Sequence, residues 1–361
     1  MKLKYAVIVI IAIALIICLL ALLGRNVDVR IDKTVNGLSP ELQEILYLGS
    51  LAPNSHNIQS WKIEVYPDEG YLTIYVDESR RLAVVDSKDR ELYISLGCYV
   101  ETLIKSFTAH GYEAKYDICQ NENCIRLDYK KISDAIDEEL IDMITKRHTD
   151  KRAFDKTISI AKTDYSYLNS DSKRIYFFSV GTDGYDLIKN ETLEAYTEQA
   201  YDEEVAAELS SWLRLSDKEA TAQKDGLPAE QLGISGIKKA LYYLCTTHES
   251  AQGKSFAEQG ITTTRNQLEG CAGFVIVNSG DSVEELILCG MKTVDLWLDL
   301  TKDSISVQPM SYAIECVEHR ETLEKELGIK NIQMILRVGF TDDYGKNAAI
   351  RRDLADYISV K

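Results

Sequence analysis

Basic residues are scarce in this sequence relative to acidic ones, 41 against 57, and the formal net charge is −16. A nucleic-acid partner requires a basic surface, so this shortage excludes one, and any anion site must be built locally. The sequence also lacks CxxC pairs, an HExxH motif and Cys/His clusters. These are the usual zinc-binding patterns, so no metal site is expected.

Charge is also missing from the stretch Tyr5 to Leu23. At roughly 1.5 Å per residue this stretch is about long enough to cross a bilayer core of about 30 Å, which predicts a transmembrane anchor over residues 1–23. Lys2 and Lys4 favour a cytoplasmic N-terminus and an external domain. Basic residues also follow the span and leave the side of the soluble domain open; these are Arg25, Arg30 and Lys33.

The same stretch lacks the small residues that processing would need. Leucines precede Gly24, so a cleaved signal peptide is not favoured. Cys18 follows two isoleucines, which makes lipid modification at this cysteine the minor alternative. We therefore expect an uncleaved, single-pass anchor.

Most of the eight cysteines stand in apolar stretches, where a free cysteine behaves as a small buried hydrophobe. Those expected to fill the core are Cys98, Cys245, Cys271, Cys289 and Cys316. Cys119 and Cys124 differ, because they flank a four-residue turn, QNEN, and can face each other across a hairpin. A bridge between them would place the domain outside the cytoplasm.

Helical and strand patterns alternate along a chain of 361 residues with 45% apolar content, which is enough for a sizeable core. Ser39 and Pro40 predict the start of a helix. Alternating runs at 61–67 and 71–77 predict a β-hairpin. Asp89 is expected to cap the helix that follows.

The stretch LAPNSHNIQSW, residues 51–61, carries amide, hydroxyl and imidazole groups within six residues. A connecting loop does not need so many side-chain hydrogen-bonding groups, and their number suggests a planar, polar ligand. The alternative is a solvated turn, since short Asn/Ser-rich runs usually mark turns.

The stretch RHTDKRAFD, residues 147–155, gathers three cations around a hydroxyl and an imidazole on an otherwise acidic chain. A phosphate monoester carries up to about two negative charges and is bound best by several such donors. The alternative is a solvated helix end.

Together the two stretches resemble two signatures of the flavin-dependent nitroreductase family, a basic R-[RH]-[ST]-x-[KR] segment and a PSSxNxQPW-like loop. The first is matched by Arg147, His148, Thr149 and Lys151, and the second by Pro53, Ser55, Asn57, Gln59 and Trp61. Asn54 and Ser60 depart from the loop pattern. VQPMSY, with Pro309, Met310 and Ser311, resembles the loop that packs on the flavin ring, and IQMILRVGF resembles the terminal strand, with Arg337 near the phosphate.

The loop precedes the basic segment, and this order, with DESRRLAVVDSKDRELYISLGC, resembles the Acg-like branch, in which two nitroreductase-like halves are fused. The resemblance implies an α+β, nitroreductase-like fold with a central, mostly antiparallel sheet, flanking helices and two pseudo-symmetric halves that mimic a dimer. The helices at Gly97 and Gly290 open on similar ELxxxxG and ELxxxG patterns. The expected boundaries are anchor 1–23, linker 24–38, first half 39–140 and second half 141–361.

The resemblance implies FMN as cofactor, NAD(P)H as electron donor and one flavin site between the halves. The basic segment would form this site together with five residues of the loop, which are Pro53, Asn54, Ser55, Asn57 and Gln59. Negative charge develops at N1 and the C2 carbonyl of the reduced ring, where a cation is stabilising. Lys151 is the first candidate for that role, with Arg265 or Asn266 as weaker candidates. Backbone amides at Met310 and Ser311 are expected near N5.

The predicted function is a membrane-anchored FMN oxidoreductase that reduces a nitroaromatic or quinone-type acceptor with NAD(P)H. One alternative is a flavin-binding or flavin-sequestering protein with little or no reductase activity. Another is a membrane-tethered pseudoenzyme with an empty site. Because NAD(P)H is a cytoplasmic reductant, an external domain would need another donor. Pairing with a second copy stays open.

Overall fold

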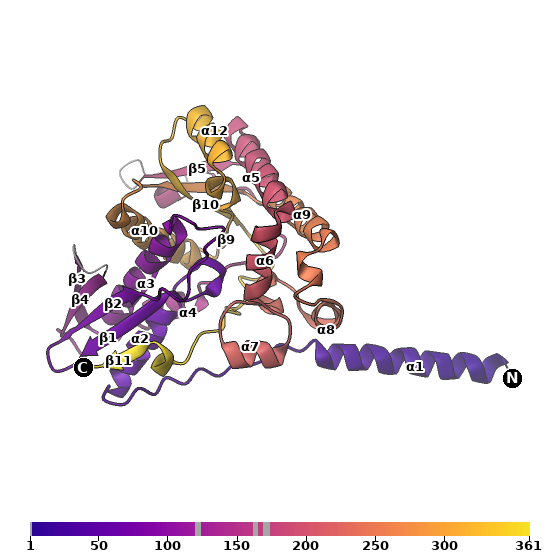
Figure 1. The fold of residues 1–361 in the computed structure, drawn as a ribbon, viewed down its shortest axis with the longest axis horizontal. Helices are drawn as coiled ribbons and strands as arrows, with labels where there is room; N and C mark the ends of the chain where they lie inside the picture. Colours follow the sequence, from indigo (N-terminus) through magenta and orange to yellow (C-terminus); the bar gives the residue numbers. More distant parts are fainter. Residues whose placement is uncertain (1, 120–123, 162–164, 169–173) are drawn as a thin grey trace.

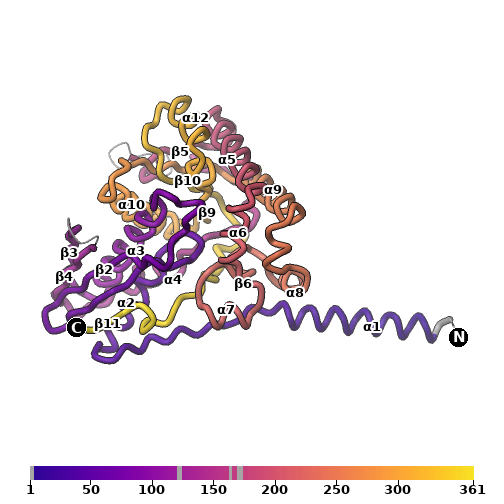
Figure 2. Tube along the Cα trace, viewed as in Figure 1, coloured from indigo at the N-terminus to yellow at the C-terminus, as the bar shows by residue number. Residues whose placement is uncertain are grey.

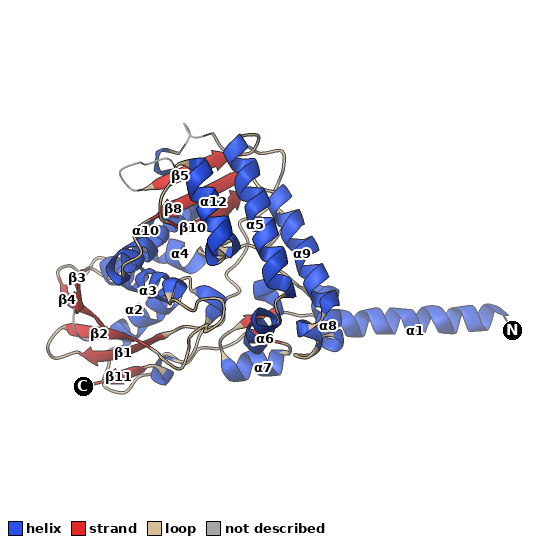
Figure 3. Cartoon of the chain, turned by 45° about the horizontal axis from the view of Figure 1, so that its top comes forward, coloured by secondary structure: helices blue, strands red, loops and turns tan. Residues whose placement is uncertain are grey.

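The computed structural model describes residues 2–119, 124–161, 165–168 and 174–361. These residues form a mixed α+β fold, as the sequence predicts (Figure 1). Figure 3 shows two separate groups of strands with long helices between and around them.

The strands are β1 Trp61–Tyr66, β2 Tyr71–Val76, β3 Tyr112–Cys119, β4 Cys124–Lys131, β5 Ile175–Ser179, β6 Leu213–Arg214, β7 Leu227–Pro228, β8 Gly273–Asn278, β9 Ser306–Pro309, β10 Ile332–Gly339 and β11 Ile358–Val360. The α-helices are α1 Lys2–Leu23, α2 Pro40–Ser50, α3 Arg90–Ala109, α4 Glu138–Lys146, α5 Asp183–Tyr201, α6 Glu203–Trp212, α7 Asp217–Gln223, α8 Gly236–Cys245, α9 Lys254–Glu269, α10 Val283–Lys302, α11 Tyr312–Glu315 and α12 Val317–Leu327. Single 3₁₀ turns are η1 Ser55–Asn57, η2 Ser166–Leu168, η4 Ala229–Leu232, η5 Ser250–Gln252 and η6 Leu354–Asp356.

The first sheet has the strand order β11-β1-β2-β4-β3. The predicted β1–β2 hairpin is confirmed, with Ile63 opposite Ile74. Strand β11 comes from the C-terminal end of the chain and lies parallel to β1, with Ile358 beside Ile63. The last residues of the chain therefore complete a sheet built by its first part, so the two ends of the folded domain are held together.

The second sheet has the order β5-β8-β10-β9, and all its pairs are antiparallel. The predicted antiparallel pairing is thus confirmed, but the expectation of one central sheet is wrong, because the strands divide over two main sheets and the two-stranded β6–β7. Helices α3 and α10 account for this division. Their apolar side chains pack in one hydrophobic core together with side chains from both main sheets.

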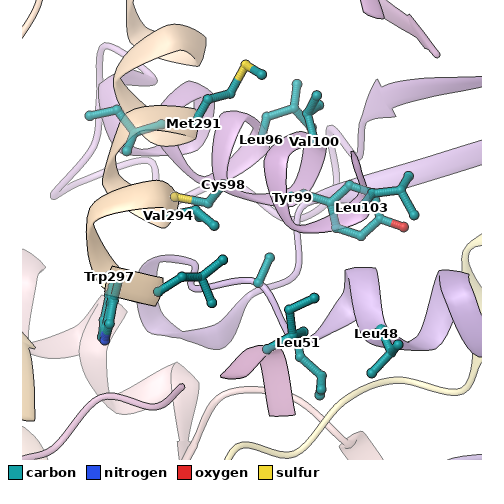
Figure 4. Close-up of a cluster of buried hydrophobic side chains, with 14 of the residues drawn as sticks. Leu48, Leu51, Leu96, Cys98, Tyr99, Val100, Leu103, Met291, Val294 and Trp297 are labelled. Carbon is teal, nitrogen blue, oxygen red and sulfur yellow. The ribbon is translucent and has the colours of Figure 1, made fainter. Parts of the chain in front are cut away.

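Helices α3 and α10 cross at a pair of glycines. A Cβ on Gly97 would lie 2.0 Å from the Ile287 carbonyl oxygen, and one on Gly290 would lie 2.0 Å from that of Ile94. Only glycine permits this approach. Figure 4 shows the side chains beside the crossing, where Cys98 of α3 faces α10. Each glycine thus lies against the backbone of the other helix. The division into two pseudo-symmetric halves stays a prediction.

Local signals set two of the helix starts. The Ser39 hydroxyl accepts a hydrogen bond from the Leu42 amide at 3.2 Å, with Pro40 in the first turn, so the predicted start of α2 is confirmed. The predicted cap of α3 is wrong. Asp89 is in the left-handed region and makes no cap, and the carboxylate of Asp86 accepts from the Glu91 and Leu92 amides instead.

A disulfide joins Cys119 at the end of β3 to Cys124 at the start of β4, with the two Cα atoms 5.3 Å apart. The turn expected between them, residues 120–123, lies outside the described residues. Cys98, Cys271 and Cys289 are buried as expected and Cys316 is partly buried, but Cys245 is exposed on α8, so its expected core position is wrong.

Helix α1 projects from the rest of the molecule, as the tube in Figure 2 shows. In the described part of the chain it is the helix that is long and apolar enough to cross a membrane, and none of the residues from Lys4 to Leu23 that make up this apolar window is buried. A signal sequence has the same length and composition, so these features alone do not distinguish the two.

Candidate functional site

A cavity of about 440 Å³ lies where the loop after α2, the basic segment after α4 and the β9–α11 connection meet. Its size is within the range of small-molecule and cofactor sites. The predicted site residues that line it are Pro53, Asn54, Ser55, Asn57, Arg147, His148, Thr149, Lys151, Pro309 and Ser311. The fold therefore brings together segments about ninety and one hundred and sixty residues apart in the chain.

The loop 53–59 has an unusual backbone. His56, Asn57 and Gln59 have positive φ angles of 47°, 54° and 52°, a region that residues other than glycine rarely adopt. The Asn54 side-chain oxygen accepts from the Gln59 amide at 2.9 Å and closes the loop. Backbone of this kind persists only where its surroundings hold it, and it is concentrated at ligand sites.

The polar side chains of this loop mostly hold the fold. The Asn57 amide donates to the carbonyl oxygens of Gly226 and Ile350 at 3.1 and 3.0 Å, so both of its donor hydrogens are used. Gln59 donates to the Lys224 carbonyl oxygen and accepts from the Arg352 amide. A ligand can therefore meet this loop through Asn54, Ser55 and the backbone more readily than through Asn57 or Gln59.

The basic segment is held at the free edge of the second sheet. Thr149 forms an isolated parallel bridge with Val307 of β9, and the Asp150 amide donates to the Val307 carbonyl oxygen at 2.8 Å. The buried Asp150 carboxylate accepts from the Arg152 guanidinium and from the Ser306 hydroxyl. Arg152 also pairs with Asp343, so the charge of this arginine is neutralised within the fold.

Arg147 is a buried cation with spare hydrogen-bonding capacity. One of its terminal nitrogens donates to the Leu51 carbonyl oxygen at 2.7 Å, and the other is buried with no hydrogen-bond partner among the described residues. The guanidinium lies 4.7 Å from the centre of the Trp297 ring. Burial lowers the pKa of Arg147 to about 10. The unpartnered nitrogen costs free energy that an anion in the cavity would offset.

Lys151 is the second cation of the cavity wall. Its side chain is partly exposed to the cavity, but the surrounding protein removes it from bulk water and lowers its pKa to about 8. No carboxylate in the described parts of the chain forms an ion pair with Lys151 or with Arg147. Both charges are therefore available to a bound anion.

A third cation, Arg351, was missed by the sequence analysis. It is buried and lines the cavity, and its guanidinium donates to the carbonyl oxygens of residues 50–52 and, at 2.8 Å, to the Asn57 side-chain oxygen. Burial and the nearby Arg147 lower its pKa to about 9. The only available signal was the pair Arg351-Arg352 on an acidic chain, and nothing in the sequence placed it against a loop three hundred residues away.

The remaining members of the basic segment and of the β9–α11 connection have defined places. The Nδ1 of His148 donates to the Lys146 carbonyl oxygen at 2.8 Å, and burial lowers the pKa of His148. Ser311 follows β9 at the start of α11. Both residues border the cavity, as do Thr149 and Pro309.

Five predicted residues do not line the cavity: Gln59, Met310, Arg337, Arg265 and Asn266. Arg337 is fully buried and donates to the carbonyl oxygens of Gln267 and Arg152, so it supports the basic segment from behind. The Met310 amide donates to the Ile335 carbonyl oxygen and is not free for a ligand. Arg265 and Asn266 are exposed on α9. Contact of these residues with FMN stays a prediction.

The lining of the cavity also contains two carboxyl groups, Glu91 of α3 and Glu315 of α11. Each of them shifts the pKa of the other, and their side chains are close enough to share a proton. Burial alone would raise the pKa of Glu91, but Arg90 and the Ser55 hydroxyl, at 2.5 Å, hold it below its usual value. Burial and the Glu91 charge raise the pKa of Glu315 well above its usual value, so Glu315 carries the shared proton. His56 lies beside this pair, 3.4 Å from the Ser55 hydroxyl.

Fold and site thus define a mixed α+β protein with a cavity whose lining contains both cations and two interacting carboxyl groups. No protein-family model matches the chain, and no curated protein matches it either. Among solved structures it is similar to the FMN-dependent nitroreductase NfnB from Mycobacterium smegmatis in complex with NADPH, at 15% identity and a TM-score of 0.37, over 61% of this chain and 96% of that chain. A likeness this low carries no argument, so the function is inferred from the site.

Proposed function

We propose that the protein is a membrane-anchored, FMN-dependent oxidoreductase that reduces quinone-type or nitroaromatic acceptors with NAD(P)H. The observation that carries the proposal is a set of three cations, Arg147, Lys151 and Arg351, in the lining of one cavity of a chain with net charge −16. Within the described residues none of the three has a carboxylate partner. Uncompensated buried charge is costly, and it is retained where a ligand compensates it.

The residues of the cavity fit FMN. A phosphate would take the unpartnered nitrogen of Arg147 and the ammonium of Lys151. Ile94, Trp297 and Pro309 supply the apolar part of the lining that a flat ring requires. Arg351 has its donors on backbone and Asn57 oxygens, so it would act through its charge.

When bound, FMN supplies the transfer of two electrons, and the chain supplies position, charge and a proton. Lys151 adds positive charge that stabilises an anion in the cavity. The segment from Leu227 to Ser235 contributes several residues to the lining of the cavity. The Glu315 carboxyl group holds a proton that it shares with Glu91, and this proton can pass to a substrate oxygen.

The compartment bears on the electron donor. A disulfide such as Cys119–Cys124 persists in oxidising compartments, which favours a domain outside the cytoplasm. NAD(P)H is a cytoplasmic reductant, so this observation favours a second candidate, a membrane-tethered flavin-binding protein with little or no NAD(P)H-dependent activity. The single flavin site between two fused halves of an Acg-like chain, and α1 as an uncleaved anchor, belong to both candidates.

The visible absorption spectrum of the purified full-length protein, before and after anaerobic NADH or NADPH, tests the proposal. A flavin spectrum that bleaches and returns on addition of a quinone is the expected result. A flavin spectrum that does not bleach would support the second candidate. A colourless protein that takes up no added FMN would overturn both.

A further inference from the structure

An apolar stripe stands exposed on α8, next to the end of α1. Ile237, Leu241 and Leu244 are 40%, 46% and 65% exposed, and Cys245 beside them is exposed too. Their spacing of four and three residues puts them on one face of the helix. Helix α8 is seen along its axis in Figure 1, whereas α1 runs across the page, so α8 lies across the direction of α1.

Helix α8 is fixed to the end of α1. A Cβ on Gly24 would lie 1.9 Å from the Gly236 carbonyl oxygen, so the two backbones touch. The fully buried Lys239 donates to the Arg25 carbonyl oxygen at 2.9 Å and pairs with Glu230 and Asp217 at 2.5 and 2.7 Å. If α1 crosses a bilayer, these contacts hold α8 at the bilayer surface.

Charge near this contact suits a membrane surface. Arg25 and Lys238 are exposed within two residues of the touching glycines. An amphipathic helix with an apolar face and basic residues at its edge binds in the headgroup region of a bilayer. A bilayer therefore explains both the exposed apolar face and the adjacent basic charge.

The same contact forms part of the cavity. Asn26, two residues after Gly24, lines the cavity. The three residues that precede α8, Gly233, Ile234 and Ser235, line it too. Glu230, the partner of Lys239, lines it as well. The part of the cavity wall nearest α8 would therefore lie at the membrane surface.

We propose that α8 lies in the membrane interface beside α1 and holds the cavity against the bilayer, so that the acceptor is a lipid-dissolved quinone. The inference rests on the proposed function for its chemistry. The quinone gains two electrons and two protons to become the quinol. NAD(P)H would supply a hydride equivalent through the flavin, and the further proton would come from Glu315, which solvent then reprotonates.

The first test locates α8 and does not depend on flavin. In full-length protein in vesicles, with Cys18 and Cys245 replaced by serine, an environment-sensitive fluorophore is attached to L241C or, as a control, to V317C, since Val317 is exposed on α12. Quenching of the L241C label by a lipid-attached quencher and not by iodide is expected, with the reverse for V317C. Iodide quenching at both sites, or shielding of the L241C label from both quenchers as by a second copy, would overturn the proposal.

The second test concerns the acceptor. The flavin of the full-length protein in vesicles is photoreduced, and its reoxidation is followed with a long-tailed quinone in the lipid or a short-tailed quinone in water. The variant L241D/L244D is expected to slow the first reaction by about tenfold or more and to leave the second unchanged. Equal rates in the variant and the unaltered protein would overturn the assignment. Failure with both quinones would refute the proposed function, while the labelling result would still decide the position of α8.

Discussion

Replacement of Lys151 by methionine removes one charge of the cavity at nearly constant side-chain length. In the described part of the chain Lys151 has no carboxylate partner, and burial lowers its pKa from 10.5 to about 8. A bound phosphate would supply the missing partner. A hydrogen bond to a charged group contributes about 2 kcal/mol net, so the dissociation constant of FMN is expected to rise roughly thirtyfold in K151M.

The pH dependence of binding follows from the same pKa. Lys151 is protonated below about pH 8 and loses its proton above it. An anion binds the protonated form, so the FMN affinity of the unaltered protein should be full below about pH 8 and fall above it, by at most about tenfold per pH unit. The variants K151M and K151R should lack this fall, K151M because the charge is absent and K151R because it is retained.

The assay is a calorimetric or fluorescence titration of the full-length apoprotein with FMN between pH 6 and pH 9. K146M is a matched control, because Lys146 stands outside the cavity and pairs with Asp142 on the surface of α4. An unchanged dissociation constant in K151M, or the same alkaline fall in K151M and the unaltered protein, would refute the role of Lys151.

Three further predictions follow from the packing and the charges. G97A places a Cβ 2.0 Å from the Ile287 carbonyl oxygen. Overpacking of this kind costs about 1–3 kcal/mol, so the melting temperature should fall by several degrees. An unchanged melting temperature would show that the α3–α10 crossing can relax. R351K removes hydrogen-bond donors to the carbonyl oxygens of residues 50–52. Amide hydrogen exchange in residues 51–59 should therefore be faster, and FMN binding should be weaker. Unchanged exchange would contradict the role of Arg351 in holding the loop. E315Q removes a titrating group. Above the usual pKa of 4.5 the native state keeps the Glu315 proton, whereas the unfolded chain releases it, so the free energy of unfolding of the unaltered protein should fall as the pH rises. This fall should be smaller in E315Q, and parallel pH profiles of the two proteins would argue against a protonated Glu315.

Local structure followed closely from local sequence. The start of α2 and the β1–β2 hairpin were predicted correctly because a hydroxyl followed by proline, and two alternating runs joined by a turn, act through neighbouring residues. The cap of α3 was predicted wrongly, although the helix was correct. Asp86 and Asp89 both precede α3, and only the backbone of the preceding turn determines which carboxylate reaches the free amides.

The candidate site was found only in part from the sequence. The loop and the basic segment stood out by their own composition, and both line one cavity. Arg351, Glu91 and Glu315 line the same cavity but were missed, because the residues beside which they lie in space are distant from them in the chain.

The sequence by itself determined the alternation of helices and strands, the apolar N-terminal helix and the two polar segments, since periodicity and composition are properties of contiguous residues. Only the tertiary structure decided which charges stay available. Arg152 is neutralised by Asp150 and Asp343, whereas Arg147 and Lys151 in the same segment are not. The tertiary structure also engages the side chains of Asn57 and Gln59 in hydrogen bonds to the backbone, and it leaves Cys245 exposed on α8. Burial and charge pairing depend on side chains that only folding brings together, so the chemistry of the cavity is a property of the fold.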